Sequence, residues 1–267
     1  MFNPTTHSLV LRACNEDMSS TKGFIWPTSG LVECSDWNPV SKCGNGLHGW
    51  LYGHGDGSVS EYWSVSDRWL VVAVETKSIV ELEGKVKFPK GEVVFCGDRK
   101  SATEFLLEYE PRSKDQPVIG AFITVNDKLT ATTSYKGTST SGHYGTSTSG
   151  DSGTSTSGHY GTSTSGFGGT STSGHHGTST SGFNGTSTSG HHGTSTSGFG
   201  GTSTSGDSGT STSGHHGKCK AGVKGIIQIR YYDNDGYKIK TGYIGEDGLE
   251  PDVFYKLDEN FNFVKCE

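Results

Sequence analysis

Ten copies of an eight-residue unit, Gly-Thr-Ser-Thr-Ser-Gly plus a variable pair, run without interruption from Gly137 to His216. A period kept in strict phase is typical of stacked copies of one structural unit, whereas a flexible Gly/Ser linker has no reason to preserve it. Alternation over positions 2 to 5 is the period of a short strand, and glycines at positions 1 and 6 give the backbone freedom that a tight turn needs. The repeat therefore predicts a regular stack of strands.

Two imperfect units indicate which side chains point inward. "GKCKAGVK" (Gly217 to Lys224) has lysines at positions 2 and 4, and small or apolar residues at positions 3, 5 and 7. Because lysines stay in water, positions 2 and 4 are expected to face out, and positions 3, 5 and 7 to face a thin core. Buried serine hydroxyls there need partners, either one another or backbone groups. "LTATTSYK" (Leu129 to Lys136) fits upstream, so repeats span residues 129–224.

Two units, sixteen residues, make one closed coil, which predicts a flattened, two-sided β-solenoid. In alternate units position 7 is mainly histidine along one edge (His143, His159, His175, His191) and mainly phenylalanine along the other (Phe167, Phe183, Phe199). Stacked rings along an edge would add packing that a serine core cannot supply. Six coils at the ~4.8 Å strand spacing give a rod about 25 to 30 Å long, with two files of threonine on each broad face.

The regions on either side of the repeat have ordinary apolar content. Residues 1–128 predict a mixed α/β domain with strand-like runs such as "SLVLRAC", "RWLVVAVE" and "VIGAFITV", and one helix, "RKSATEFLLEYE", between Asp98 and Pro111. Residues 225–267 predict a small β-meander that caps the last coil, because an uncovered coil is a template for aggregation. The chain is therefore expected to be mainly β, with domains at 1–128, 129–224 and 225–267.

Composition excludes several classes of partner. The net charge of −6 and the absence of basic runs disfavour nucleic acid, and no apolar stretch is long enough for a membrane helix. The N-terminus lacks the pattern of a cleaved signal, and six dispersed cysteines suggest free thiols. A cytoplasmic protein is the expectation.

A resemblance follows from three features of the chain. "CGNGLHGW" supplies a Cys-x-x-Gly-Leu-His pattern at Cys43, Gly46, Leu47 and His48, and it occurs with eight-residue units and a tail containing "DVFYKL". Together these resemble a family of uncharacterised proteins from bacteriophages and bacterial genomes. That family's repeats commonly read Ala-Thr-Ala-Gly, so serine at the inward positions is a departure that makes the core more polar. The resemblance implies a fold and a phage-like origin, with the host cytoplasm as location, rather than an activity.

An irregular, aromatic stretch from Gly23 to Trp69 is the expected place for a pocket, and it contains every tryptophan of the chain. The candidate pocket residues are Arg12, Trp26, His48, Trp50 and Glu61. An enzymatic alternative gives Arg12, His48 and Glu61 the roles of polar groups in a nucleotide pocket, loosely similar to ADP-ribosyltransferase-like folds.

Metal sites are the weaker hypotheses. No cofactor is predicted, but Cys43 and His48 could bind zinc together with other cysteines (Cys14, Cys34, Cys96). His54 and Asp56 in "GHGDG" could extend such a site or simply be turn residues. The histidine file could bind a metal or titrate as a group, although no carboxylates alternate with it.

The threonine files are the most specific surface feature. They resemble the ice-binding faces of insect antifreeze proteins, in which regular Thr-x-Thr spacing orders water. A flat, uncharged β face can also dock against a second copy of the chain. The sequence favours a non-enzymatic, self-associating scaffold whose N-terminal domain binds an unknown ligand or partner, with ice binding as the alternative. The binding face is expected at Thr146, Thr148, Thr162, Thr164, Thr178, Thr180, Thr194 and Thr196.

Overall fold

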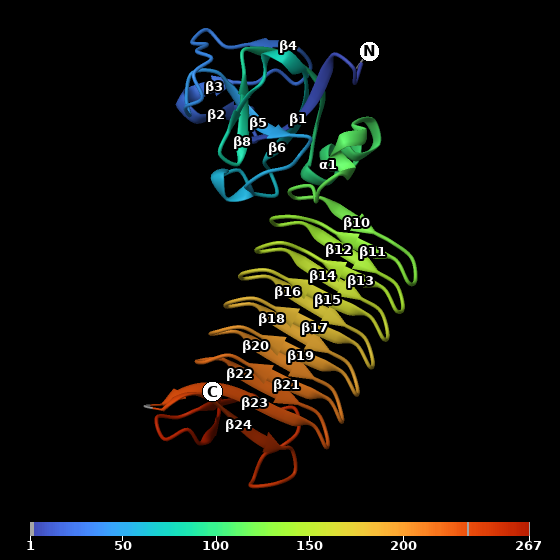
Figure 1. Cartoon of the computed structure of the whole chain (residues 1–267), viewed down its shortest axis with the longest axis vertical. Coiled ribbons are helices and arrows are strands. Elements are labelled where there is room, and N and C mark those ends of the chain that lie inside the picture. Colours follow the sequence, from blue (N-terminus) through green and yellow to red (C-terminus); the bar gives the residue numbers. More distant parts are fainter. Residues whose placement is uncertain (1–2, 234, 267) are drawn as a thin grey trace. The chain divides into compact units, whose positions relative to one another are not determined.

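The computed structural model describes residues 3–233 and 235–266 of the chain, which divides into two compact units, Met1–Phe122 and Ile123–Glu267 (Figure 1). In the described residues no helix is both long enough and apolar enough to cross a membrane. The expected division at residues 128 and 224 stays a prediction.

The first unit is built on a seven-stranded antiparallel sheet with the strand order β4-β9-β6-β1-β5-β8-β7. β1 lies at its centre between β6 and β5 and pairs with β6 along its whole length, from His7↔Glu75 to Cys14↔Arg68. The strands are β1 (His7–Cys14), β4 (Gly30–Glu33), β5 (Leu47–Leu51), β6 (Arg68–Glu75), β7 (Val80–Leu82), β8 (Lys85–Phe88) and β9 (Lys90–Gly97), with a separate pair β2 (Ser19–Ser20) and β3 (Phe24–Ile25).

The predicted helix is α1 (Arg99–Tyr109), which packs on β6, β9 and β1. Its N-terminus is capped by Asp98, whose carboxylate accepts a hydrogen bond of 2.9 Å from the Ser101 backbone N–H. Just after α1, the buried Glu110 accepts bonds from the Arg112 guanidinium and from the Leu9 backbone N–H. This ion pair, in which only Glu110 is fully buried, connects the end of the helix to the central strand.

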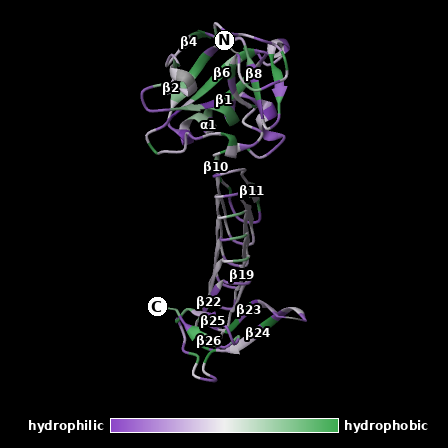
Figure 2. Ribbon diagram, turned by 90° about the vertical axis from the view of Figure 1, so that its left-hand side faces the viewer, coloured by the Kyte–Doolittle hydropathy of each residue, from purple (hydrophilic) through white to green (hydrophobic). Residues whose placement is uncertain are grey.

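The two faces of the first sheet are both covered. Alternate residues of β1 and β6 on one face join an apolar cluster with Trp26, Val86 and Phe88. Figure 2 shows strongly hydrophobic residues gathered in this unit, whereas the repeat strands have nearly neutral hydropathy. The first unit therefore has a conventional apolar core.

The repeats form the flattened two-sided β-solenoid that the sequence predicts, with strands alternating between two parallel sheets. Each strand pairs with the strand sixteen residues later in identical register, as in Thr154↔Thr170. One sheet contains β10 (Phe122–Thr124), β12 (Thr138–Ser141), β14 (Thr154–Ser157), β16 (Thr170–Ser173), β18 (Thr186–Ser189), β20 (Thr202–Ser205) and β22 (Lys218–Ala221). The other contains β11 (Thr130–Thr132), β13 (Thr146–Thr148), β15 (Thr162–Ser165), β17 (Thr178–Ser181), β19 (Thr194–Ser197) and β21 (Thr210–Ser213).

Serines at positions 3 and 5 fill the space between the sheets, as expected. Most position 3 hydroxyls bond across the core, for example Ser187 Oγ to Ser179 Oγ at 2.9 Å. Within the described residues, most position 5 hydroxyls, such as that of Ser189, are buried without a partner. Only half of the predicted pairing of buried hydroxyls is therefore present.

Two details of the repeat differ from expectation. Position 7 side chains, such as Phe167 and Val223, are about half exposed on the edges and do not enter the core. Glycines at positions 1 and 6 are needed for close approach, not for a left-handed backbone. A Cβ on Gly193 would lie 2.6 Å from the Ser189 Cβ, and one on Gly174 would lie 2.9 Å from the His159 backbone nitrogen. The left-handed residue of each turn is at position 8, for example Tyr144 at φ 56°.

The C-terminal segment caps the solenoid with two antiparallel hairpins, as predicted. β23 (Ile226–Asp233) continues one sheet and pairs with β24 (Gly236–Tyr243), while β25 (Tyr255–Leu257) and β26 (Phe263–Lys265) continue the other after β22. Here the serine core gives way to an apolar cluster that includes Cys219, Ile227 and Tyr255. The reversal of strand direction ends the parallel stack.

Candidate functional site

One face of the solenoid carries an uninterrupted array of threonines, which we call the threonine array. It consists of the Thr-x-Thr pairs on six successive strands of one sheet, β11 to β21, from Thr130 to Thr212. In-register pairing puts equivalent threonines side by side, as in Thr162↔Thr178 and Thr164↔Thr180. The array includes Thr146, Thr148, Thr162, Thr164, Thr178, Thr180, Thr194 and Thr196, the face expected from the sequence.

Few hydroxyls of this array are bonded to other protein groups in the part of the chain that the structure describes. Among the described residues, only that of Thr212 is bonded to a protein group, the Gln228 amide oxygen at 3.1 Å. Thr162, Thr178 and Thr194 are exposed, and their neighbours two residues later are half-buried. No charged residue stands at these positions. The array thus presents methyl and hydroxyl groups on a two-dimensional grid, with ~4.8 Å between strands and about 6.6 to 6.8 Å along them.

The opposite sheet has a shorter version of the same pattern. Its Thr-x-Thr pairs occupy five strands, β12 to β20, and the next strand, β22, replaces both threonines by Lys218 and Lys220. The two ammonium groups lie 5.1 and 4.9 Å from the centre of the Phe254 ring. A charged strand therefore ends this face, and the threonine array is the longer of the two.

The two edges of the solenoid are lined by stacked rings. On one edge, ring centres of successive histidines are 4.7–5.0 Å apart from His143 to His191. On the other, Phe167, Phe183 and Phe199 stack at 5.3 and 5.0 Å. Desolvation by the adjacent rings, followed by the charges of the neighbouring histidines, lowers the pKa of His175. The ring columns are as regular as the strands.

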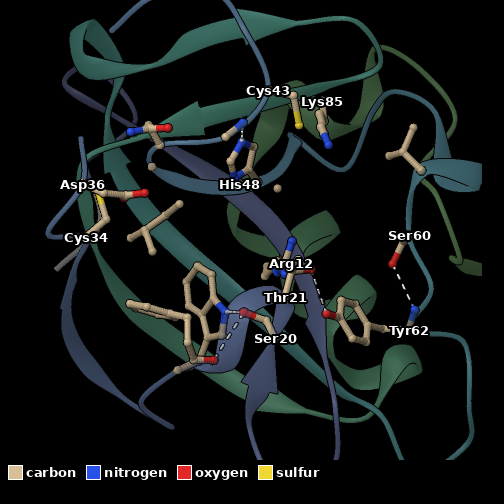
Figure 3. A pocket seen from close by; sticks show the side chains of 18 of the residues that line it. Arg12, Ser20, Thr21, Cys34, Asp36, Cys43, His48, Ser60, Tyr62 and Lys85 are labelled. Atoms are coloured by element: carbon tan, nitrogen blue, oxygen red, sulfur yellow. Dashed lines mark hydrogen bonds between the residues drawn. The ribbon is translucent and has the colours of Figure 1, made fainter. Parts of the chain in front are cut away.

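The five candidate pocket residues all line one cavity of about 550 Å³ in the first unit (Figure 3). Arg12 comes from β1, Trp26 follows β3, His48 and Trp50 lie on β5, and Glu61 lies in the loop after residue 59. Among the further lining residues, Tyr62, Lys85 and Asp36 are polar or charged groups that the sequence analysis did not predict. Tyr62 directly follows Glu61, and Lys85 is the first residue of β8, which pairs with β5. Asp36 is far in sequence from the candidate residues, so no local signal points to it.

Cys43 and His48 do not form a metal site with their neighbours. Among residues 3–233 and 235–266, no group of three or more His, Cys, Asp or Glu side chains is placed to hold a metal ion. His48 Nε2 accepts a hydrogen bond from the Gly44 backbone N–H at 3.4 Å. His54 contacts the Ser113 carbonyl, and Asp56 caps a short 3-10 helix. All six cysteines, each within the described ranges, are free thiols.

The solenoid defines the class of the molecule: it is a β-solenoid repeat protein with a globular domain before the repeats. Residues 8–108 match a family model described as a domain of unknown function, DUF7666. The chain is similar to the ice nucleation protein InaU of Pantoea ananas, with 39% identity over 103 residues, and to an ice nucleation protein of Pseudomonas syringae, with 45% identity over 103 residues. These matches cover 38% and 37% of the chain, but only 10% and 9% of the relatives.

A third relative, an ice nucleation protein of Xanthomonas campestris pv. translucens, is 38% identical over 106 residues, or 39% of the chain and 7% of the relative. No solved structure matches the chain. The chain thus corresponds to about a tenth or less of the length of these relatives. The likeness is to part of an ice nucleation protein.

These findings correct two expectations. The prediction of a cytoplasmic location is wrong, because the curated relatives are ice nucleation proteins of bacteria. That prediction depended on a missing leader pattern, which carries no positive information about location, and on a phage resemblance. The comparisons give no support to a phage origin or to the Cys-x-x-Gly-x-His pattern as a family signature.

Proposed function

We propose that the solenoid is an ice-binding element and that the threonine array is its ice-binding surface. The observation that carries this proposal is the array itself: in-register Thr-x-Thr pairs on six parallel strands, with hydroxyls free for solvent. The names of the relatives, which are ice nucleation proteins, support the same function. The ice-binding alternative thereby takes precedence over the scaffold reading.

Three physical properties suit the array to this role. Threonine is β-branched, so few rotamers are open to it and its methyl and hydroxyl groups keep defined positions. Stacking of identical coils keeps the sheet regular, whereas an open sheet of independent strands would twist. A charged side chain would orient nearby water around itself, and the array has none. Water against this surface therefore meets the same donor, acceptor and apolar group at every strand.

The size of the threonine array determines whether it is expected to bind existing ice or to nucleate new ice. Six strands span five strand spacings, about 24 Å. A surface lowers the barrier to nucleation more as it orders a larger area of water, so a single array is expected to bind growing ice. Nucleation would need several arrays in one plane. Face-to-face or side-by-side association of copies is the second candidate function, and the Thr-x-Thr pattern on the opposite sheet favours it.

The decisive experiment compares matched variants on the two faces. Thr164→Lys with Thr180→Lys puts two charges at position 4 of the array, and Thr172→Lys with Thr188→Lys does the same on the opposite sheet. All four threonines are half-buried, so the foldedness of the two variants should be similar. We expect thermal hysteresis, and any rise in droplet freezing temperature, to be lost in the first variant and kept in the second.

Light scattering on the same samples tests association. A wild-type oligomer that dissociates only in the opposite-sheet variant would support docking through that sheet. Wild-type protein that changes neither ice growth nor droplet freezing would contradict the ice-binding proposal, and equal losses in both variants would contradict the choice of the threonine array over the opposite sheet.

A further inference from the structure

Arg12 is a cation on the core side of the central strand of the first unit. In β1 it alternates with Val10 and Cys14, which belong to the apolar cluster on that face. A charged group in such a position is costly unless it is paired. Within the described residues the Arg12 Nε is buried and has no hydrogen-bond partner. The strand therefore carries a charge that the apolar packing does not explain.

The described residues around Arg12 supply aromatic rings, and none of their carboxylates forms an ion pair with it. Its guanidinium carbon lies 5.5 Å from the ring centres of both Trp26 and Tyr62. Burial raises the pKa of the Cys14 thiol to about 11, although the charge of Arg12 opposes this, so the thiol is neutral near pH 7. Asp36 and Glu61 line the same cavity, but among the described residues neither lies within the 4.0 Å ion-pair distance of Arg12. The guanidinium is contacted by aromatic faces and is open to the cavity.

A second cation in the cavity wall, Lys85, also has no ion-pair partner among the described residues. Lys85 lines the cavity beside Cys43, and none of the ion pairs of the described chain includes it (Figure 3). The neighbouring Lys87 is buried differently: its ammonium donates to the carbonyls of Lys42 and Gly44, at 2.8 and 3.2 Å, and so holds the loop that borders the cavity. Lys87 is therefore structural, and Lys85 is free to meet a ligand.

The pKa of His48, which lines the same cavity, shows that positive charge dominates there. Burial first, and then the charges of Lys85, Arg12 and Lys87, lower the pKa of His48 to about 4. The ring is therefore neutral near pH 7, and the cations around it outweigh the carboxylates at that point. In Figure 3, Arg12 and His48 lie near the centre of the view, whereas Asp36 lies beside Cys34 on another wall.

We propose that this cavity binds a small organic anion, a carboxylate or a phosphate attached to a flat ring. Arg12 is the anchor for the anionic group, because a guanidinium can donate two parallel hydrogen bonds to either chemistry. Lys85 adds a second positive charge at the rim. Phe24, Trp26 and Trp50 form the apolar wall for the ring. The volume of about 550 Å³ is within the range of small-molecule sites. This proposal does not depend on ice binding.

A series of simple probes tests the proposal on the full chain. Benzoate and phenyl phosphate carry the two anionic groups on one ring, and benzamide is a neutral molecule of similar shape. Titration followed by tryptophan fluorescence and calorimetry should give saturable binding of at least one anion, at least about tenfold tighter than benzamide. Preference between benzoate and phenyl phosphate distinguishes a carboxylate site from a phosphate site. No saturation by either anion up to about 50 mM would overturn the proposal.

Three variants connect the binding to named residues. Arg12→Gln should weaken the preferred anion about tenfold or more, Lys85→Gln about threefold, and Lys90→Gln, an exposed control on β9, less than twofold. None should alter benzamide binding. If circular dichroism shows that Arg12→Gln does not fold, the proposal is tested by Lys85→Gln and by the wild-type probe series. Wild-type affinity in folded Arg12→Gln, or in Lys85→Gln when Arg12→Gln is unfolded, would overturn the proposal.

Discussion

At the scale of single residues, the repeat unit combines two serines with different roles. Both are buried, but most position 3 hydroxyls bond across the core and most position 5 hydroxyls have no partner within the described residues. A buried hydroxyl without a partner costs free energy, whereas a paired one contributes modestly to stability. Serine at position 5 is therefore explained by its small size next to the following glycine rather than by bonding.

This difference predicts opposite outcomes for two neighbouring substitutions. Ser187→Ala removes the bond to Ser179 and should lower the free energy of unfolding by about 0.5 to 1.5 kcal/mol. Ser189→Ala removes an unpaired hydroxyl of the same strand and should be neutral or stabilising by up to about 1 kcal/mol. Urea unfolding of both proteins checks the prediction. Equal destabilisation would show that the position 5 hydroxyls are in fact satisfied.

At the scale of elements, the edge columns add packing that the strands lack. Identical strands give no aromatic contacts of their own, and the turns supply them at intervals of about 5 Å, as between Tyr144 and Tyr160. The stacked histidines of one edge, from His143 to His191, form a histidine column, and His175 in this column has a lowered pKa. At its end, His191 Nδ1 lies 3.5 Å from the Asp207 carboxylate, so the last ring has an acidic neighbour. The inner rings face other histidines instead.

The column predicts that the solenoid weakens in acid. Because the folded-state pKa of His175 is lowered, the unfolded chain binds more protons just below its ordinary pKa of about 6.5. Stability is complete above that pH and falls as the pH drops below it. Hydrogen exchange of β14 to β18, corrected for intrinsic rates, should show less protection at pH 5 than at pH 7.

His175→Gln should remove most of this pH dependence, because the ring whose folded-state pKa is lowered is then absent. An unchanged dependence in the variant would contradict the prediction. Salt should also reduce the effect in the wild-type protein, because the rings are exposed and their repulsion is screened.

The sequence predicts the repeat elements better than the first unit. The sixteen-residue coil, the outward threonines and the inward serines follow from phase and from the lysines of one imperfect unit, and the C-terminal hairpins follow from strand-like runs separated by turns. The run "VIGAFITV" yields a strand only at β10, which begins one solenoid sheet. In the first unit the cavity could be assigned to a stretch of chain, but Tyr62 and Lys85 come together only through long-range strand pairing, which no local pattern encodes.

At the scale of the whole chain, the solenoid is modular in steps of sixteen residues, not eight. A deletion of residues 161–176 removes one coil and leaves each remaining side chain on its own edge. A deletion of residues 161–168 removes half a coil and exchanges the edges of everything that follows, so that His159 meets Phe183. The strands themselves are unchanged in both cases.

We expect the sixteen-residue deletion to keep the transition cooperative and to shorten the threonine array by one strand. The eight-residue deletion should lower the free energy of unfolding by about 1 to 2 kcal/mol more than the sixteen-residue deletion does, because it breaks matched ring pairs on both edges. Chemical unfolding of both deletions measures the difference. If the shorter deletion is the more stable of the two, the ring columns contribute nothing to the choice of phase.

The sorting of rings on the two edges has a consequence for folding. Ten strands with the same Thr-Ser-Thr-Ser sequence can pair with many wrong partners as the stack forms. A shift of the pairing by one eight-residue unit leaves all strand-to-strand contacts unchanged. The variable pair distinguishes the two halves of each coil. A strand that joins the stack one unit out of phase brings a phenylalanine beside a histidine on the edge. It also leaves the last coil in the wrong phase for the C-terminal cap. The two residues of each unit that appear free to vary are those by which the chain finds its own register.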